Sequence, residues 1–389
     1  MGNTYNLTDV CAPYEGLSFK EIESRLFTII LGDYAEWKLS STIPKVRLKV
    51  PSSKWKVLSS VQKCVRRGNV PYGVHGAVAL HRDNAKNLYR RLSIMAFEDI
   101  GLANPELALF MSLIKGRASW IESMGGPLFT AYLVTKLCES LKDRTICDIA
   151  YGASIAHETA AVRSIWPSHY DPDELKGIAV NSSSKSVHMK HTALAAIGGS
   201  LSTGDRFNQT KSKKNMSLYT EVVETYGLPS LLNMLAIKGG AGGLEGLAFA
   251  VPLLSAALLS GPVEIKVCEL PSTPVIGGVP ALAYDKHVQE GKRAYAYFSK
   301  SCHPVAKWLE SYEGNKVNLI GSAFFNGESG SLLDRMLIYP EQEEFFRSGL
   351  VGEAAFYGLT VERLYEFYEL VNQHHDTVNQ ARDRIINGK

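Results

Sequence analysis

Residues 88–106 read LYRRLSIMAFEDIGLANPE. The apolar residues between Leu88 and Ile100 recur at the spacing of one helix face. Gly101 is typical of a helix end. Asn104, followed by a proline and a glutamate, is typical of a helix start, because it offers a side-chain cap, a first-turn proline and a first-turn acid. The segment therefore predicts two helices joined by a tight turn.

Helical patterns extend in both directions from this hairpin and predict a mainly α protein, a helical bundle or array. The apolar run from Leu247 to Leu259 is too short to span a bilayer and predicts a buried helix. The other helices are expected at residues 17–37, 127–141, 146–165, 281–300, 303–311, 341–347 and, as one long amphipathic helix, 360–387.

Two short segments alternate with a period of two. Residues 45–50 place three cations on one side and three aliphatic side chains on the other, which predicts a small, basic β element. Residues 263–267 alternate in the same way and predict a second strand.

Changes in composition suggest four segments. These are an N-terminal helix with the basic strand segment (1–58), a helical domain (59–170), a linker with a basic loop and a buried helix (171–280), and a C-terminal helical region (281–389).

The length, hydrophobic content and net charge of the chain favour a globular protein. The chain has 389 residues, is 45% hydrophobic and carries a formal charge of +3. Its six cysteines form no C-x-x-C pair and no zinc-site spacing, so we expect reduced thiols, no metal and a cytoplasmic location.

Charge is distributed unevenly along the chain. Residues 37–82 contain no Asp or Glu but ten Lys and Arg residues, together with Trp37, Trp55 and Tyr72. Cations neutralise a phosphate backbone and aromatic faces stack on unpaired bases, so this mixture favours single-stranded nucleic acid as the partner. A solvated basic surface without a ligand is the alternative.

The common catalytic motifs are missing from the sequence. The chain has no Gly-Lys-Ser/Thr phosphate loop and no G-x-S-x-G elbow. Adjacent carboxylates such as Glu98 and Asp99 point about 100° apart on a helix, so a structural pairing with Arg90, Arg91 or a helix end is the simpler interpretation. We therefore expect no enzyme activity and no cofactor.

Residues 89–105, with the upstream pattern at 60–68 and 77–80, resemble the helical region that follows the ATPase in the RarA/MgsA family of clamp-loader-related AAA+ proteins. The similarity covers roughly residues 59–114. The resemblance implies a helical collar that oligomerises, commonly as a tetramer, on replication intermediates with single-stranded DNA. The chain departs from the family because it contains no phosphate loop, so the ATP-dependent functions of the family are not expected.

The first hypothesis is a single-stranded DNA-binding protein without ATPase activity, acting in DNA replication or transcription initiation. A phage origin, with action in the bacterial host cytoplasm and recruitment of an RNA or DNA polymerase, is compatible with this role. The expected partners are single-stranded DNA and further copies of the chain, and no membrane. The expected binding residues are Lys45, Arg47, Lys49, Lys54, Trp55, Lys56, Lys63, Arg66, Arg67, Lys211, Lys213 and Lys214.

Two alternatives remain open. The chain could be a helical oligomeric scaffold that binds an acidic protein or a polymerase and not DNA. It could also be a metal-dependent nuclease built on Asp285, His287 and the pair His188 and His191, which share a helix face.

Overall fold

The structure is a computed structural model. It describes residues 4–40, 53–156, 158–160, 163, 171–180, 185–200, 202–203, 210–242, 244, 246–267, 270, 273–331, 334–337 and 341–388. The protein is mainly helical, as the sequence predicted. The basic β element expected at residues 45–50 lies outside the described residues.

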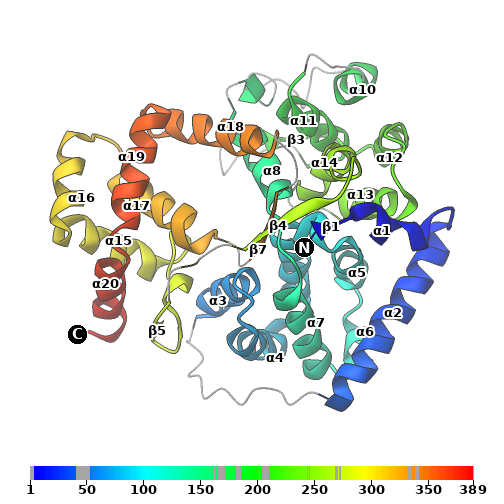
Figure 1. The fold of residues 1–389 in the computed structure, drawn as a ribbon, viewed down its shortest axis with the longest axis horizontal. Helices are drawn as coiled ribbons and strands as arrows, with labels where there is room; N and C mark the ends of the chain where they lie inside the picture. The colour runs from blue at the N-terminus through cyan, green and yellow to red at the C-terminus, as the bar shows by residue number, and fades with distance from the viewer. Residues whose placement is uncertain are drawn as a thin grey trace.

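The helices of the first two thirds of the chain surround one large hydrophobic core, which runs from Leu7 to Val263 (Figure 1). We call this part the amino-terminal lobe. Its helices are α1 (Leu7–Cys11), α2 (Phe19–Ser40), α3 (Lys54–Arg66), α4 (Val70–Met95), α5 (Pro105–Ile114), α6 (Ala118–Ser123), α7 (Pro127–Glu139), α8 (Thr145–Ile155), α10 (Pro172–Val180), α11 (Val187–Ile197), α12 (Met216–Glu224), α13 (Ser230–Ala241) and α14 (Val251–Leu258).

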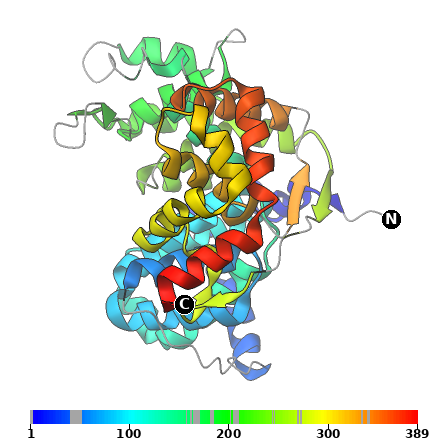
Figure 2. The ribbon, with the colours of Figure 1, turned by 90° about the vertical axis from the view of Figure 1, so that its left-hand side faces the viewer.

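A second, smaller core joins residues between Ala294 and Ala381. This carboxy-terminal lobe forms the left side of Figure 1, and Figure 2 views it face on. Its α18 lies against α8 of the other lobe. The helices of this lobe are α15 (Gln289–Ser301), α16 (His303–Trp308), α17 (Lys316–Phe324), α18 (Glu341–Phe356), α19 (Val361–Asn372) and α20 (His375–Asn387).

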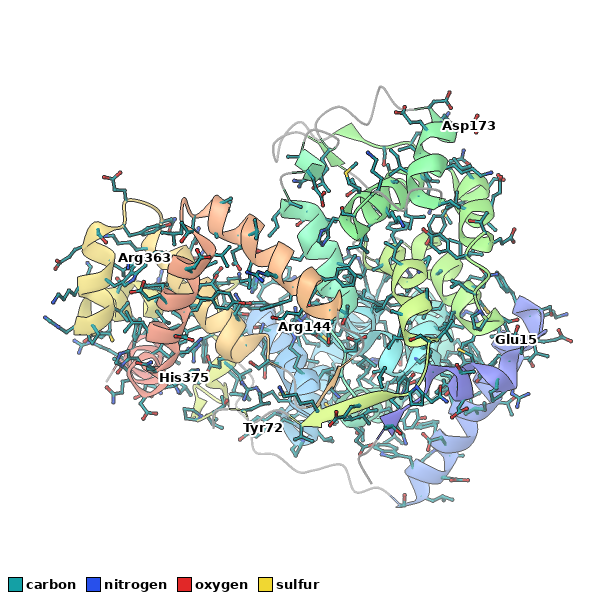
Figure 3. All side chains as sticks on the ribbon, turned by 45° about the horizontal axis from the view of Figure 1, so that its top comes forward. Glu15, Tyr72, Arg144, Asp173, Arg363 and His375 are labelled. Carbon is teal, nitrogen blue, oxygen red and sulfur yellow. The ribbon has the colours of Figure 1, made fainter. Side chains whose placement is uncertain are left out.

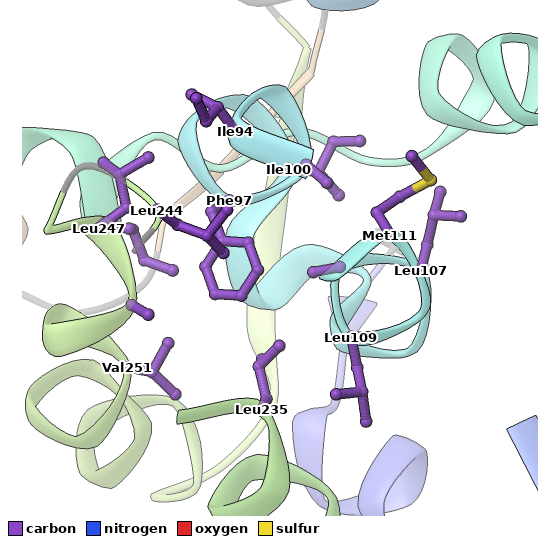
Figure 4. Close-up of a cluster of buried hydrophobic side chains, with 14 of the residues drawn as sticks. Ile94, Phe97, Ile100, Leu107, Leu109, Met111, Leu235, Leu244, Leu247 and Val251 are labelled. Atoms are coloured by element: carbon purple, nitrogen blue, oxygen red, sulfur yellow. The ribbon is translucent and has the colours of Figure 1, made fainter. Parts of the chain in front are cut away.

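The hairpin predicted at residues 88–106 is present. Helix α4 continues into a π-helical turn, η2 (Ala96–Ile100), and the chain reverses at Gly101, whose φ of 55° suits glycine. The Asn104 side chain accepts a hydrogen bond from the Leu107 backbone N–H at 3.0 Å and so caps α5. Phe97 of the π turn is fully buried and lies at the centre of the apolar cluster drawn in Figure 4.

Short turns connect several of these helices. The 3₁₀ turns are η1 (Ala12–Tyr14), η3 (Gly101–Ala103), η4 (Leu247–Ala250), η5 (Ala281–Ala283) and η6 (Leu309–Ser311), and a second π-helical turn, η7 (Phe325–Ser329), follows α17. The buried helix expected at residues 247–259 is formed by η4 and α14. The single helix expected at residues 360–387 is instead two, because α19 ends at Asn372 and α20 begins at His375.

Three small antiparallel sheets complete the described fold. The largest joins distant parts of the chain in the order β1-β4-β7, with Tyr5 opposite Val263 and Glu264 opposite Leu337. The strand predicted at residues 263–267 is its central member. The strands are β1 (Thr4–Tyr5), β2 (Ser202–Thr203), β3 (Thr210–Lys211), β4 (Val263–Val267), β5 (Val275–Ile276), β6 (Val279–Pro280) and β7 (Asp334–Leu337).

Candidate functional site

The outer end of α3 is open to solvent. The Trp55 side chain is 61% exposed, and the Lys54 ammonium lies 6.0 Å from the centroid of its ring. The two other aromatic residues of the basic segment differ, because Trp37 packs against Tyr34 and Tyr132, and Tyr72 is half-buried. Among the aromatic residues of this segment that the structure describes, Trp55 is therefore the one that offers a free ring.

Lys56, the next cation along α3, faces the carboxy-terminal lobe. Its Nζ lies 2.6 Å from Glu290 Oε1, and both side chains are largely covered. An ion pair of this kind offsets part of the positive charge. Lys56 is thus a weaker candidate for a phosphate contact than Lys54.

The inner end of α3 contradicts the prediction that Lys63 and Arg66 contact nucleic acid. Lys63 Nζ lies 2.5 Å from Asp285 Oδ2, and Arg66, only 1% exposed, donates to Asp99 Oδ1 and to Glu98 Oε1 at 2.6 Å each. These cations are enclosed because α3 lies on the side of the amino-terminal lobe that contacts the carboxy-terminal part of the chain. They neutralise carboxylates of the protein instead of phosphates.

Arg66 and Arg67 also tie the lobes together through backbone carbonyls. Arg66 donates to the Ser329 carbonyl at 2.9 Å, and Arg67 donates to the Glu328 carbonyl at 2.7 Å. The Glu328 side chain is fully buried and accepts from Arg382 at 2.8 Å. Arg67 therefore has a structural role in this arrangement.

The pKa values of the two carboxylates around Arg66 are shifted in opposite directions. Burial opposes ionisation of Glu98, but Arg66 and Arg144 hold its pKa below the usual range. Burial, with the nearby charge of Glu98, raises the pKa of Asp99 despite Arg66. Arg66 and Arg144 form ion pairs with both acids, and the charge of Arg91 also lowers the pKa of Glu98, so the two acids have the structural role that the sequence predicted.

The pKa shifts of Lys63 and Asp285 favour different states of the pair. A lowered pKa favours the neutral amine of Lys63 but the charged carboxylate of Asp285. Burial lowers the pKa of Lys63 in spite of the carboxylate. Burial also opposes ionisation of Asp285, yet Lys63 and His287 hold the pKa of Asp285 well below its usual range. Lys63 and Asp285 form an ion pair at neutral pH, because a neutral amine at 2.5 Å would leave a fully enclosed carboxylate without the charge of its nearest partner.

Both π-helical turns contribute to the junction between the lobes. Turn η2 supplies Glu98 and Asp99, and turn η7 supplies Phe325 and the Ser329 carbonyl. A π turn inserts an extra residue and redirects the side chains that follow, and such turns are frequent at functional sites.

A cavity of about 660 Å³ opens at this junction. Its walls come from α3, η2, the start of α8, η7 and α18, and Trp55 lies at the edge that α3 contributes. Arg144, labelled in Figure 3, lies between the lobes and is one of the cations that line the cavity. The size is that of a small-molecule site.

Phe325 forms a notable part of the cavity wall. Three cations approach its ring, with Lys286 Nζ 4.7 Å from the centroid and the guanidinium carbons of Arg66 and Arg144 each at 5.6 Å. Cations favour the negative face of an aromatic ring. Phe325, Lys286 and Arg144 were not predicted from the sequence, because the three lie in separate segments and carry no motif.

The remaining predicted residues lie elsewhere. Lys45, Arg47 and Lys49 fall outside the described residues, and the side chain of Lys211 is not described. Lys213 and Lys214 are exposed, and Lys214 donates to the Ala241 carbonyl at 2.9 Å. This segment lies near β3 at the top of Figure 1, well away from α3, and Figure 2 shows the same separation. The structure does not bring these lysines to Trp55.

The histidines considered for a metal site are occupied in other ways. His191 is buried and its Nε2 lies 3.0 Å from the Gly246 carbonyl, whereas His287 pairs with Asp285. Within the described part of the chain, no group of three or more His, Cys, Asp or Glu side chains could hold a metal ion. Among the described residues, no helix is both long and apolar enough to cross a membrane.

Comparison of the chain with protein-family models, with curated proteins and with solved structures gave no match.

Proposed function

We propose that this protein binds single-stranded DNA through the outer end of α3 and acts in DNA replication or transcription initiation. The observation that carries the proposal is the 61% exposure of Trp55 beside Lys54, within the segment of residues 37–82 that has no acidic residues. An indole ring exposed to this extent can stack on an unpaired base, and the adjacent cations can neutralise phosphates.

The proposed interface is smaller than the sequence alone suggested. Lys63, Arg66 and Arg67 are assigned to the junction between the lobes, and the segment with Lys213 and Lys214 lies apart. Lys54 and Trp55 remain, together with the cations Lys45, Arg47 and Lys49 that precede them in the sequence. Oligomerisation and recruitment of a polymerase belong to the same proposal, and they rest on the resemblance of residues 59–114 to the RarA/MgsA collar.

The salt dependence of binding tests the proposal. If about four phosphates are neutralised, log affinity should fall against log salt with a slope near −3, so affinity should drop ~50-fold between about 50 and 200 mM salt. Fluorescence anisotropy with a labelled single-stranded oligonucleotide measures this slope, and an unlabelled duplex serves as competitor. Binding that does not saturate, or that ignores salt, would refute the proposal.

A scaffold that docks a protein is the second candidate. It is supported by two exposed apolar residues of α18, Val351 at 52% and Phe356 at 73% exposure. Exposed apolar side chains are typical of protein contacts when they cluster. A chain that forms oligomers or captures a polymerase, but shows no saturable oligonucleotide binding, would favour this candidate.

A further inference from the structure

We propose that the cavity between the lobes binds a free nucleoside monophosphate. This site is distinct from the proposed DNA interface, with which it shares only the side chain of Trp55 at its edge. The proposal does not depend on the DNA-binding function. It is carried by three features of the cavity walls, which are aromatic rings, a partly buried ammonium group and a buried carboxylate.

The first feature is the set of aromatic side chains. Phe325 from η7, Tyr151 from α8, and Phe345 and Phe346 from α18 all line the cavity. Rings from three separate elements thus line one cavity, and a flat, polarisable ring can pack against them. The volume of about 660 Å³ is ample for a nucleotide, since pockets for small molecules span roughly 300–1,000 Å³.

The second feature is Lys286. Its Nζ donates to Ser322 Oγ at 3.0 Å and lies over the Phe325 ring, and no carboxylate among the described residues lies within ion-pair distance of it. An ammonium group has three donors, so two remain for a ligand. Burial lowers the pKa of Lys286 although the nearby charges of Glu353 and Asp285 act to raise it, and a bound phosphate would add a negative charge beside the ammonium group.

Three acids, Glu98, Asp148 and Glu353, line the cavity and limit how negative the ligand can be. Glu98 is held by Arg66, Arg144 and Gln62, so its charge is offset within the protein. Glu353 also lines the cavity, is only 5% exposed and receives Asn326 Nδ2 at 3.5 Å. A ligand with one anionic group and a ring that donates hydrogen bonds satisfies both Lys286 and Glu353. A nucleobase joined to a single phosphate has this combination.

Filling the cavity provides a clean test. Gly349 on α18 lines the cavity, and a Cβ built on it meets only Tyr151 Cδ1 at 3.8 Å, an ordinary contact. Gly349→Leu therefore adds a side chain at the cavity wall with no clash at its Cβ, and leucine is a better helix former than glycine. Gly32→Leu on α2 is the matched control, because Gly32 is exposed and its Cβ would meet nothing within 4 Å.

The experiment is isothermal titration calorimetry of the full chain with AMP, GMP, CMP and UMP. At least one should bind saturably to the wild type and to Gly32→Leu, and Gly349→Leu should weaken it by about tenfold or more. Adenosine or the matching nucleoside, and inorganic phosphate alone, should each bind at least about tenfold more weakly.

Lys286→Met separates the two recognition elements, with Lys292→Met on the exposed face of α15 as its control. It should weaken the nucleotide and leave the weak binding of the nucleoside unchanged. The proposal is overturned if no monophosphate binds the wild type, if Gly349→Leu binds as tightly as Gly32→Leu, or if the nucleoside binds as well as the nucleotide. Oligonucleotide affinity should be the same in Gly349→Leu and Gly32→Leu, which distinguishes failure of this proposal from failure of the DNA interface.

Discussion

The two ends of α3 carry the same kind of side chain and face opposite environments. At the outer end Lys54 and Trp55 are exposed to solvent. At the inner end, three turns later, Lys63 and Arg66 are enclosed and paired with carboxylates. A run of cations in a sequence therefore does not define one surface, since burial decides whether each charge meets solvent, a ligand or an acid of the protein itself.

The largest expected effect is a difference in stability between variants at the two ends of α3. Arg66→Met should lower the free energy of unfolding by about 3–5 kcal/mol, because it removes the guanidinium group that hydrogen-bonds to the buried Asp99 and to the partly covered Glu98. Lys54→Met, the matched change at the exposed end, should alter stability by no more than about 0.5 kcal/mol. Urea denaturation of both variants measures the difference, and equal stabilities would remove the distinction between the two ends.

The second prediction concerns pH. The pKa of Asp285 is lowered in the folded protein, so the stability from this carboxylate is present above the unfolded value of about 4 and is lost as the pH falls further. The cost of Asp285→Asn should therefore be fully present above about pH 4 and shrink below it. Denaturation of both proteins across this range measures the cost, and a cost that already shrinks at pH 6 would contradict the assigned ion pair.

His191 also contributes to the pH dependence of stability, so the effect of Asp285 is measured as the difference between the wild type and Asp285→Asn. Burial lowers the pKa of this imidazole to about 4, so protonation in the unfolded chain reduces stability as the pH falls from 6.5 toward 4. This background is common to the wild type and to Asp285→Asn, because His191 hydrogen-bonds to Gly246 and not to Asp285. The contribution of His191 therefore cancels when the unfolding free energies of the two proteins are subtracted.

A double-mutant cycle tests the pair itself. Lys63→Met should destabilise the protein by about 3 kcal/mol, since it leaves Asp285 buried with only His287 beside it. In the double variant Lys63→Met with Asp285→Asn, more than about 1 kcal/mol of that loss should be recovered. Thermal or urea denaturation of the four proteins gives the coupling energy, and additive effects would show that the contact carries no energy of its own.

The helical frame was predictable because its signals are local. Asn104 caps α5 and Gly101 ends the preceding turn through contacts within a few residues. The long helix expected at residues 360–387 was wrong because no proline or glycine marks the break before His375. The sheet β1-β4-β7 joins strands from both ends of the chain, and no local pattern specifies such a pairing.

The candidate site was predictable at its exposed end and not beyond it. Lys54 and Trp55 follow from composition, because an exposed basic and aromatic segment needs no tertiary partner. Lys63 is paired with Asp285, more than two hundred residues away, and only the fold reveals that contact. Phe325 lies on a π turn, whose register differs from the helical period that sequence reasoning assumes.

The most direct test of the central claim is the affinity of Trp55→Ala for a short single-stranded oligonucleotide, measured by fluorescence anisotropy beside Trp55→Phe and the wild type. Loss of base stacking should weaken binding by about 1–3 kcal/mol, and the phenyl ring should recover part of it. Duplex binding should hardly change. An unaltered single-strand affinity in a folded Trp55→Ala protein would contradict the assignment of the outer end of α3 as the nucleic-acid interface.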